Sequence, residues 1–227
     1  MYTVKLVDKK DVAEKTTAFW WEKPKGYVFK AGQHTSWELI DPPETDAEGN
    51  SRTFSFASAP HEENIIIASR MRDTAFKRVL HNLPIGAEIQ MGETEGSMTL
   101  HEDSSRPAVF IAGGIGITPF RSLVVDAAYK KLPHKIYLFH SNHLPADAPF
   151  FAELQNIVNP NYQYIPTMTQ AGGSHINRPM LDKYVGDLKK AVFYLAGKPQ
   201  MVAAIRDLLI FAGVEDLSIK SEEFEGY

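Results

Sequence analysis

The chain of 227 residues contains no cysteine, and no run of apolar residues in it is long enough to cross a bilayer. Without thiols it cannot form a disulfide, hold an iron–sulfur cluster, or bind zinc through cysteine. The first residues alternate in polarity as a strand does, and they lack the apolar core of a signal peptide. We therefore expect a cytoplasmic protein that does not associate with membranes.

An excess of positive charge is also missing. The sequence has 24 lysine and arginine residues against 28 aspartate and glutamate residues, which gives a formal net charge of −4. Proteins that bind nucleic acid gather basic residues, and no basic run is found, so nucleic acid is not an expected partner. Hydrophobic residues make up 44% and charged residues 23%, which is ordinary for a globular protein with a sizeable core.

Short segments of alternating polarity, separated by turns rich in glycine and proline, fill the first hundred residues. One helix is expected among them, capped by Asp73 or Thr74 and continuing to Leu83 at helical spacing. Many short strands at such intervals are typical of a small antiparallel β-barrel. Strands are predicted at residues 2–7, 16–21, 35–40, 52–58, 64–71, 88–91 and 97–100.

The pattern changes after a polar segment at residues 101–107. Apolar strands then alternate with helices, which predicts βαβ units and a parallel sheet. We expect an N-terminal antiparallel β-barrel domain over residues 1–103 and an α/β domain with a parallel sheet over residues 104–227. Strands are predicted at residues 108–112, 135–140, 162–166, 191–196 and 218–220, and helices at 119–131, 148–158, 178–184 and 199–212.

The most informative segment reads VFIAGGIGITPF at residues 109–120. An apolar run ends in Gly113, Gly114 and Gly116, after which Thr118 suits a helix N-cap and Pro119 the first helical position. Free amides and the helix dipole attract phosphate at such a turn, so it predicts a site for a dinucleotide pyrophosphate. A tight turn that binds nothing is the alternative that this motif leaves open on its own.

A second segment, residues 52–58, reads RTFSFAS. Alternation places Arg52, Phe54 and Phe56 on one face of a strand, and Thr53 and Ser55 on the other. A guanidinium can hold a pyrophosphate through paired hydrogen bonds, and an aromatic ring can stack on a flat heterocycle. An amphipathic strand with an incidental arginine is the alternative.

These motifs, in this order, resemble those of the ferredoxin–NADP reductase superfamily of flavoenzymes over nearly the whole chain. Phe54 replaces the tyrosine of the family's flavin motif, and Ala196 replaces the cysteine of its nicotinamide motif. A loop usually written Gly-Pro-x-Gly-x-Phe is replaced here by residues 91–98, which contain two glutamates. The matching segments are residues 29–33, 52–55, 113–119, 196–201 and the aromatic tail 222–227.

The resemblance implies two cofactors, FAD and either NADH or NADPH. It implies catalytic roles for Ser55 beside the flavin N5, for Glu222 in relaying a proton, and for Phe224 in covering the ring. The residues implied in FAD binding are Arg52, Thr53, Phe54, Ser55, Thr74, Lys77, Phe224 and Tyr227. Those implied in nicotinamide-nucleotide binding are Gly113, Gly114, Gly116, Thr118, Gly197, Pro199 and Met201, with Ala196 bordering the nicotinamide.

We therefore expect an FAD-dependent NAD(P)H oxidoreductase whose electron acceptor is a separate ferredoxin, flavodoxin, oxygenase component or small oxidant. NADH is slightly favoured, because residues 141–143 after the strand show no fixed cation for a 2′-phosphate. No metal site is expected, since His140 and His143 lack a third ligand. The alternatives are a siderophore-interacting-type ferric reductase and a non-enzymatic, flavin-binding electron-transfer subunit.

Overall fold

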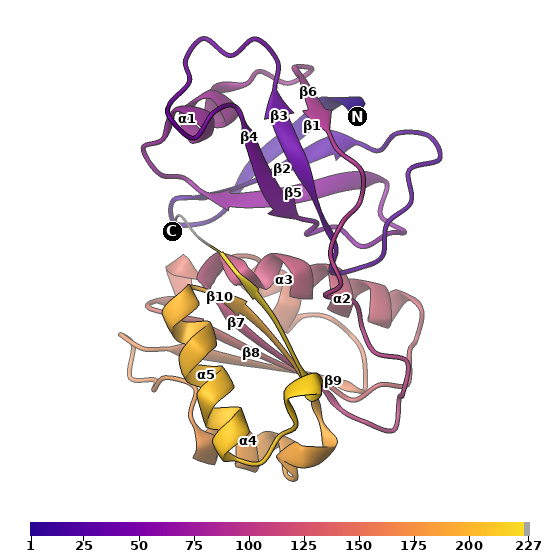
Figure 1. Cartoon of the computed structure of the whole chain (residues 1–227), viewed down its shortest axis with the longest axis vertical. Helices are drawn as coiled ribbons and strands as arrows, with labels where there is room; N and C mark the ends of the chain where they lie inside the picture. Colours follow the sequence, from indigo (N-terminus) through magenta and orange to yellow (C-terminus); the bar gives the residue numbers. More distant parts are fainter. Residues whose placement is uncertain (225–227) are drawn as a thin grey trace.

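Antiparallel strands make up the first half of the chain in the computed structural model, which describes residues 1–224 (Figure 1). They form one sheet in the order β4-β3-β6-β1-β2-β5. The two edge strands, β4 and β5, approach each other, because the amide of Ala57, just after β4, donates to the carbonyl of Ile66 on β5 at 2.7 Å. The sheet therefore curls toward closure. The predicted antiparallel barrel is confirmed. Its elements are β1 (Tyr2–Ala13), β2 (Thr16–Glu22), β3 (His34–Leu39), β4 (Ser51–Ser55), β5 (Asn64–Arg70), α1 (Ala75–Asn82) and β6 (Glu88–Met91).

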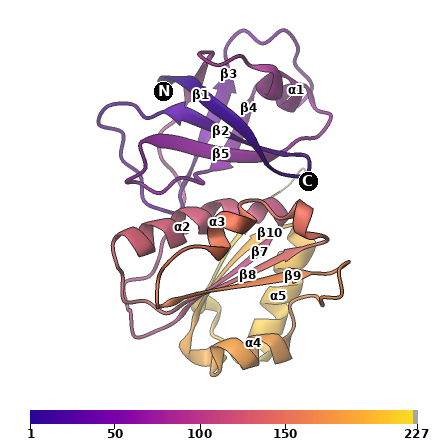
Figure 2. The same cartoon turned by 180° about the vertical axis from the view of Figure 1, so that it is seen from behind.

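The second half is a parallel sheet in the order β11-β10-β7-β8-β9. Helices α2 and α3 lie on the face of this sheet toward the barrel, and α4 and α5 cover the opposite face (Figures 1 and 2). The predicted α/β half is therefore confirmed. Its strands and helices are β7 (Ala108–Gly113), α2 (Thr118–Tyr129), β8 (Ile136–Asn142), α3 (Phe151–Gln155), β9 (Tyr162–Met168), α4 (Arg178–Val185), β10 (Val192–Gly197), α5 (Pro199–Phe211) and β11 (Ile219–Glu223).

The strand β7 is apolar throughout because both of its faces are covered. Phe110 and Ala112 belong to the cluster packed beneath the barrel, whereas Val109 and Ile111 belong to the cluster beneath α4 and α5. Strands buried on two faces have no polar side, so they read as continuous hydrophobic runs. This explains why the sequence signal for β7 was strong.

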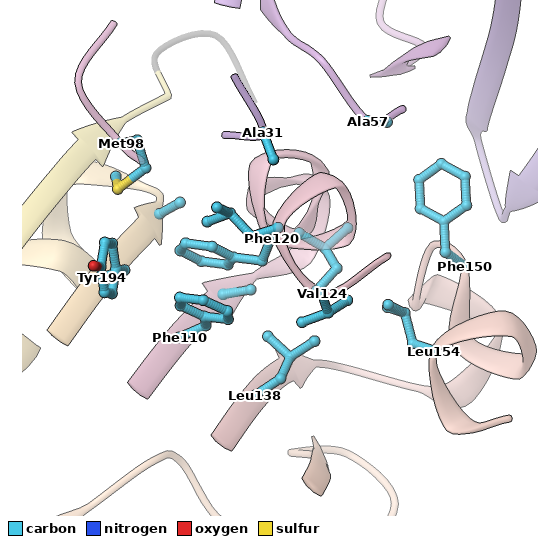
Figure 3. Packing of buried hydrophobic residues seen from close by; sticks show 14 of the residues in the cluster. Ala31, Ala57, Met98, Phe110, Phe120, Val124, Leu138, Phe150, Leu154 and Tyr194 are labelled. Atoms are coloured by element: carbon cyan, nitrogen blue, oxygen red, sulfur yellow. The ribbon is translucent and has the colours of Figure 1, made fainter. Parts of the chain in front are cut away.

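One hydrophobic core runs from the parallel sheet across α2 into the barrel (Figure 3). Phe110 of β7 stacks on Phe120 of α2 with ring centroids 5.1 Å apart and planes 3° from parallel. Ala31 and Ala57 reach the same cluster from the barrel side. The two halves therefore share buried apolar surface, which fixes the position of α2 between them. Within residues 1–224, no helix has the length and apolar character needed to span a bilayer.

Two predicted elements differ from the structure. Residues 97–100 form no strand, because the Nζ of Lys220 binds the carbonyl of Thr99 at 2.9 Å and Met98 turns its carbonyl toward Gly32. The prediction of a strand at residues 97–100 is therefore wrong. The helix predicted over residues 148–158 is confined to α3, since Phe150 adopts a left-handed φ of 59° immediately before it.

Candidate functional site

The glycine turn lies between β7 and α2, at the carboxyl edge of the parallel sheet. Gly114 begins a short 3-10 helix with a left-handed φ of +53°, which favours glycine. A Cβ atom at Gly116 would lie only 2.3 Å from the carbonyl oxygen of Ala196. Glycine is therefore required at Gly116 for the turn to pack against β10.

The predicted cap of α2 is wrong. Ile117 holds the N-cap position without a side-chain hydrogen bond, and Thr118 is the first residue of the helix. Its hydroxyl instead donates to the carbonyl of Ile115 at 3.2 Å. The 3-10 helix runs directly into α2 and supplies carbonyls for the first helical amides, so no side-chain cap is needed. Pro119 consequently follows the first helical position rather than occupying it.

A cavity that is open to solvent lies between the barrel and the glycine turn, and we call it the barrel-side cavity. Strands β4 and β5, helix α1, the turn and the end of the chain all contribute to it. It brings together six of the residues predicted from the sequence: Thr53, Phe54, Ser55, Lys77, Thr118 and Phe224. Residues separated by more than a hundred positions in the chain thus meet at one site.

The walls of the barrel-side cavity combine an aromatic ring, a hydroxyl and a cation. Phe54 is half-buried and lies against Phe76 with ring centroids 6.0 Å apart. The hydroxyl of Ser55 is buried and has no hydrogen-bond partner within residues 1–224. Burial, together with the nearby cations Arg72 and Arg52, lowers the pKa of Lys77 to about 8. A flat, hydrogen-bonding ring with an attached anion would satisfy this set of groups.

A second solvent-open cavity, the turn-side cavity, lies over the carboxyl ends of β7 and β8. In open α/β sheets, this is the edge at which ligands bind. Arg70 lines both cavities, so they adjoin each other beside the turn. The remaining lining residues are Gly113, Gly114, Ser141, Asn142, His143, Asp147, Thr169, His175, Lys198 and Met201.

The turn-side cavity contains cations that sequence reasoning missed. Arg70 comes from the barrel and Lys198 from the segment after β10, and neither is near residues 141–143 in the sequence. The carboxylate of Asp147 lies 3.9 Å from the guanidinium of Arg70. The preference for NADH was predicted from the lack of a cation near residues 141–143. Because Arg70 and Lys198 line the same cavity, this prediction no longer has support. No local sequence signal could have shown this, because the groups converge only in the folded chain.

Two predicted FAD-binding residues lie outside both cavities. The guanidinium of Arg52 binds the carboxylate of Glu48 at 2.8 Å and approaches that of Asp46 at 3.5 Å. Thr74 caps α1 by accepting from the amide of Lys77 at 3.4 Å, and Asp46 accepts from the amide of Ala75 at 2.9 Å. An incoming phosphate would therefore compete with Asp46 for these donors. The roles of Arg52 and Thr74 in binding FAD stay predictions.

The segment after β10 closes against the glycine turn. A Cβ atom at Gly113 would lie 2.6 Å from the sulfur of Met201, and Pro199 is the first residue of α5. The amide of Phe224 donates to the carbonyl of Gly197 at 3.0 Å, which holds Phe224 beside the barrel-side cavity. Tyr227, the other predicted aromatic residue, lies outside the described residues.

Glu222 reaches the barrel from the last strand. Its carboxylate lies 3.5 Å from Nδ1 of His34 on β3, and this hydrogen bond raises the pKa of His34. His34 stands opposite Ser55 in the antiparallel pairing of β3 with β4. A pair of groups that can hold a proton therefore lies next to the unpartnered hydroxyl of Ser55.

Arg121 on α2 connects the two halves and was not singled out from the sequence. Its side chain is only 6% exposed. One of its nitrogens donates to the carbonyl of Ala57 at 2.6 Å, and ion pairs join it to Glu62 of the barrel and Glu153 of α3. A charged residue in an otherwise amphipathic helix gives no sequence signal for such a network.

His140 and His143 diverge despite their spacing. His140 is fully buried and contacts the carbonyl of Gly114 and the hydroxyl of Tyr164, whereas His143 is exposed and contacts Thr169. Within residues 1–224, no group of three or more histidine, cysteine, aspartate or glutamate residues could hold a metal ion.

Known proteins share both halves of this architecture. The family described as "Oxidoreductase NAD-binding domain" matches residues 110–207. Reductase component 2 of terephthalate 1,2-dioxygenase from Comamonas sp. is 27% identical over 206 residues, covering 86% of this chain and 58% of that protein. The electron transfer component of anthranilate 1,2-dioxygenase from Acinetobacter baylyi gives the same identity and coverage. The chain thus spans about 58% of the length of these relatives.

Among solved structures, a ferredoxin NADP⁺ reductase from Neisseria gonorrhoeae with bound FAD and NADP superposes with a TM-score of 0.81. It covers 98% of both chains at 20% identity. The cytochrome P450 reductase GcoB from Amycolatopsis gives a TM-score of 0.83, covering 98% of this chain and 69% of that one at 20% identity. These matches show the fold.

Proposed function

We propose that this chain is an FAD-dependent NAD(P)H oxidoreductase. Its fold is like that of a ferredoxin NADP⁺ reductase, as its motifs predicted, and residues 110–207 match an NAD-binding family. One observation carries the proposal. Two cavities adjoin beside a glycine turn and share Arg70, so two nucleotide cofactors can meet there. Residues 1–103 would hold FAD, and residues 104–227 would hold the nicotinamide nucleotide.

The residues of the barrel-side cavity fit a flavin. Phe54 offers a ring face for stacking, and the Ser55 hydroxyl offers a hydrogen bond that no group among residues 1–224 makes. Lys77 adds a cation for phosphate, supported by the position of α1 beside the cavity. Bound flavin accepts a hydride and releases electrons singly, which is chemistry that no side chain of this protein supplies.

The protein would contribute position, shielding and proton transfer. Phe224 lines the barrel-side cavity and would shield a bound ring from water. Ser55 would orient the ring, and the His34–Glu222 pair would hold a proton at Nδ1 of His34 beside it. On the other side of the turn, the cations Arg70 and Lys198 would draw the phosphates of the nucleotide toward Gly113 and Gly114.

We propose a separate protein as the electron acceptor. Two relatives are named as the reductase or electron transfer component of a dioxygenase, so those proteins work with other components. The match spans about 58% of their length. An oxygenase component is therefore the first acceptor to test, followed by a ferredoxin, a flavodoxin and small oxidants.

The proposal is tested by the colour of the purified protein. We expect a yellow preparation with flavin absorbance, which NADH or NADPH bleaches under anaerobic conditions, because the two adjoining cavities would hold the two cofactors next to each other. A colourless protein that takes up no added FAD would contradict the proposal and favour a binding subunit. Yellow protein that neither nucleotide reduces would contradict its NAD(P)H half and favour an electron carrier reduced by a partner.

Replacing Arg52 with alanine is expected to weaken FAD retention by roughly tenfold to a hundredfold, because a phosphate would lose a charge-assisted hydrogen bond. The change also leaves Asp46 and Glu48 without their cation, which adds repulsion. Dissociation of FAD followed by fluorescence measures the effect. Arg206→Ala is the matched control, since Arg206 lies on α5, pairs with Asp216 and lines neither cavity. Equal FAD affinity in both variants would remove Arg52 from the site.

A further inference from the structure

A buried histidine lies directly beneath the glycine turn. His140 is on β8, opposite Ala112 of β7, and its side chain is fully buried. Its Nε2 lies 3.0 Å from the carbonyl oxygen of Gly114, and its Nδ1 lies 2.9 Å from the hydroxyl of Tyr164 on β9. A chain of hydrogen bonds therefore runs from the edge strand β9 to the turn.

The protonation of His140 follows from these partners. Burial lowers its pKa to about 4, so the ring is neutral near pH 7. The carbonyl of Gly114 can only accept, so Nε2 must carry the hydrogen, and Nδ1 must accept from the Tyr164 hydroxyl. Burial raises the pKa of Tyr164 above its usual value, which keeps this hydroxyl a donor. One neutral tautomer is thus fixed from both sides.

This tautomer determines which way one peptide of the turn faces. Gly114 has the left-handed φ of +53°, and its carbonyl points at His140. In a trans peptide the carbonyl and the following N–H point in opposite directions, so the amide of Ile115 faces away from His140. Gly114 lines the turn-side cavity and Ile115 the barrel-side cavity. A rotation of this peptide would alter what both cavities present to a ligand.

We propose that His140, held in one tautomer by Tyr164, is a positioning residue that sets the shape of the glycine turn and thereby the affinity for the nicotinamide nucleotide. The inference rests on the proposed function. An apolar side chain would fill the same space, but a buried polar group is costly unless it is bonded. Both ring nitrogens of His140 are bonded, and its contact on one side is the turn itself.

Two substitutions separate the hydrogen bond from simple packing. His140→Gln keeps a donor for Gly114 and an acceptor for Tyr164, whereas His140→Met fills a similar volume with neither. Binding of NAD⁺ and NADP⁺ to the FAD-loaded protein is measured by calorimetry, which needs no turnover. We expect His140→Met to weaken nucleotide binding about tenfold or more and His140→Gln to stay within about threefold of the parent, each measured on protein that carries FAD.

Nucleotide affinity in His140→Met equal to that of the parent would overturn the inference. If that variant does not fold, Tyr164→Phe replaces it, because it leaves His140 in place and removes one of the two hydrogen bonds that fix its tautomer. We then expect weaker nucleotide binding, together with ¹⁵N shifts of His140 that no longer report a single Nε2–H form. Unchanged affinity and unchanged shifts would overturn the inference. A parent protein that binds FAD but neither nucleotide would instead refute the proposed function, and this inference with it.

Discussion

Gly116→Ala is expected to weaken nicotinamide-nucleotide binding by roughly a hundredfold while leaving FAD bound. The new Cβ would lie 2.3 Å from the carbonyl oxygen of Ala196, 2.6 Å from its carbonyl carbon and 2.9 Å from the amide nitrogen of Gly197. All three atoms are backbone, and β10 is paired with β7 on one side and β11 on the other. The sheet cannot yield, so the turn must move away from its binding shape.

Gly113→Ala is the matched control for this prediction. Its Cβ would meet the sulfur and terminal methyl of Met201 at 2.6 and 3.2 Å, and a flexible side chain can move aside. We expect it to weaken nucleotide binding much less than Gly116→Ala does, with calorimetry as the measurement and flavin absorbance as the check on FAD. Equal effects in the two variants would show that the close approach to β10 is not what shapes the site.

Arg121→Met is expected to lower the free energy of unfolding by about 3 kcal/mol, because it leaves part of a buried ion network without its cation. Arg121 joins Glu62 of the barrel to Glu153 of α3, and it also donates to the carbonyl of Ala57. The glutamates are 23% and 41% exposed, so water offsets part of the loss and the effect stays near the low end for buried pairs. Urea unfolding followed by circular dichroism measures it.

Arg206→Met provides the comparison for Arg121, because its partner Asp216 is 67% exposed and surface ion pairs contribute about 1 kcal/mol or less. We expect this variant to unfold near the parent's urea midpoint. A loss for Arg121→Met no larger than for Arg206→Met would mean that the network adds nothing to the connection between the two halves. A second unfolding step in Arg121→Met alone would mean that the halves had become independent.

The architecture could be predicted because its signals are local. Parallel strands buried on both faces read as apolar runs, and the short alternating segments of the barrel are separated by turn residues. The strand at residues 97–100 failed for the opposite reason. Met98 and Thr99 direct their carbonyls to Gly32 and Lys220, which lie far away in the sequence. Polarity alternation says nothing about such distant partners.

The candidate site likewise contains residues that local motifs predict and residues that only the folded chain brings together. Phe54, Ser55, Gly113 and Gly114 could be chosen from motifs, and the structure brings them to two adjoining cavities. Arg70 and Lys198 could not, because each enters the site from a different part of the fold. The N-cap assigned to Thr118 failed since a 3-10 helix precedes α2, and such a turn has no distinct polarity pattern.

Two adjacent residues of α2 donate hydrogen bonds to the carbonyls of two adjacent residues of the barrel. Arg121 donates to Ala57 and the hydroxyl of Ser122 donates to Ser58, each at 2.6 Å. Only a few residues separate these bonds from Ser55 in the barrel and from the turn that precedes α2. The distance between the two proposed cofactor sites is therefore set by the folding of the chain, before any nucleotide binds.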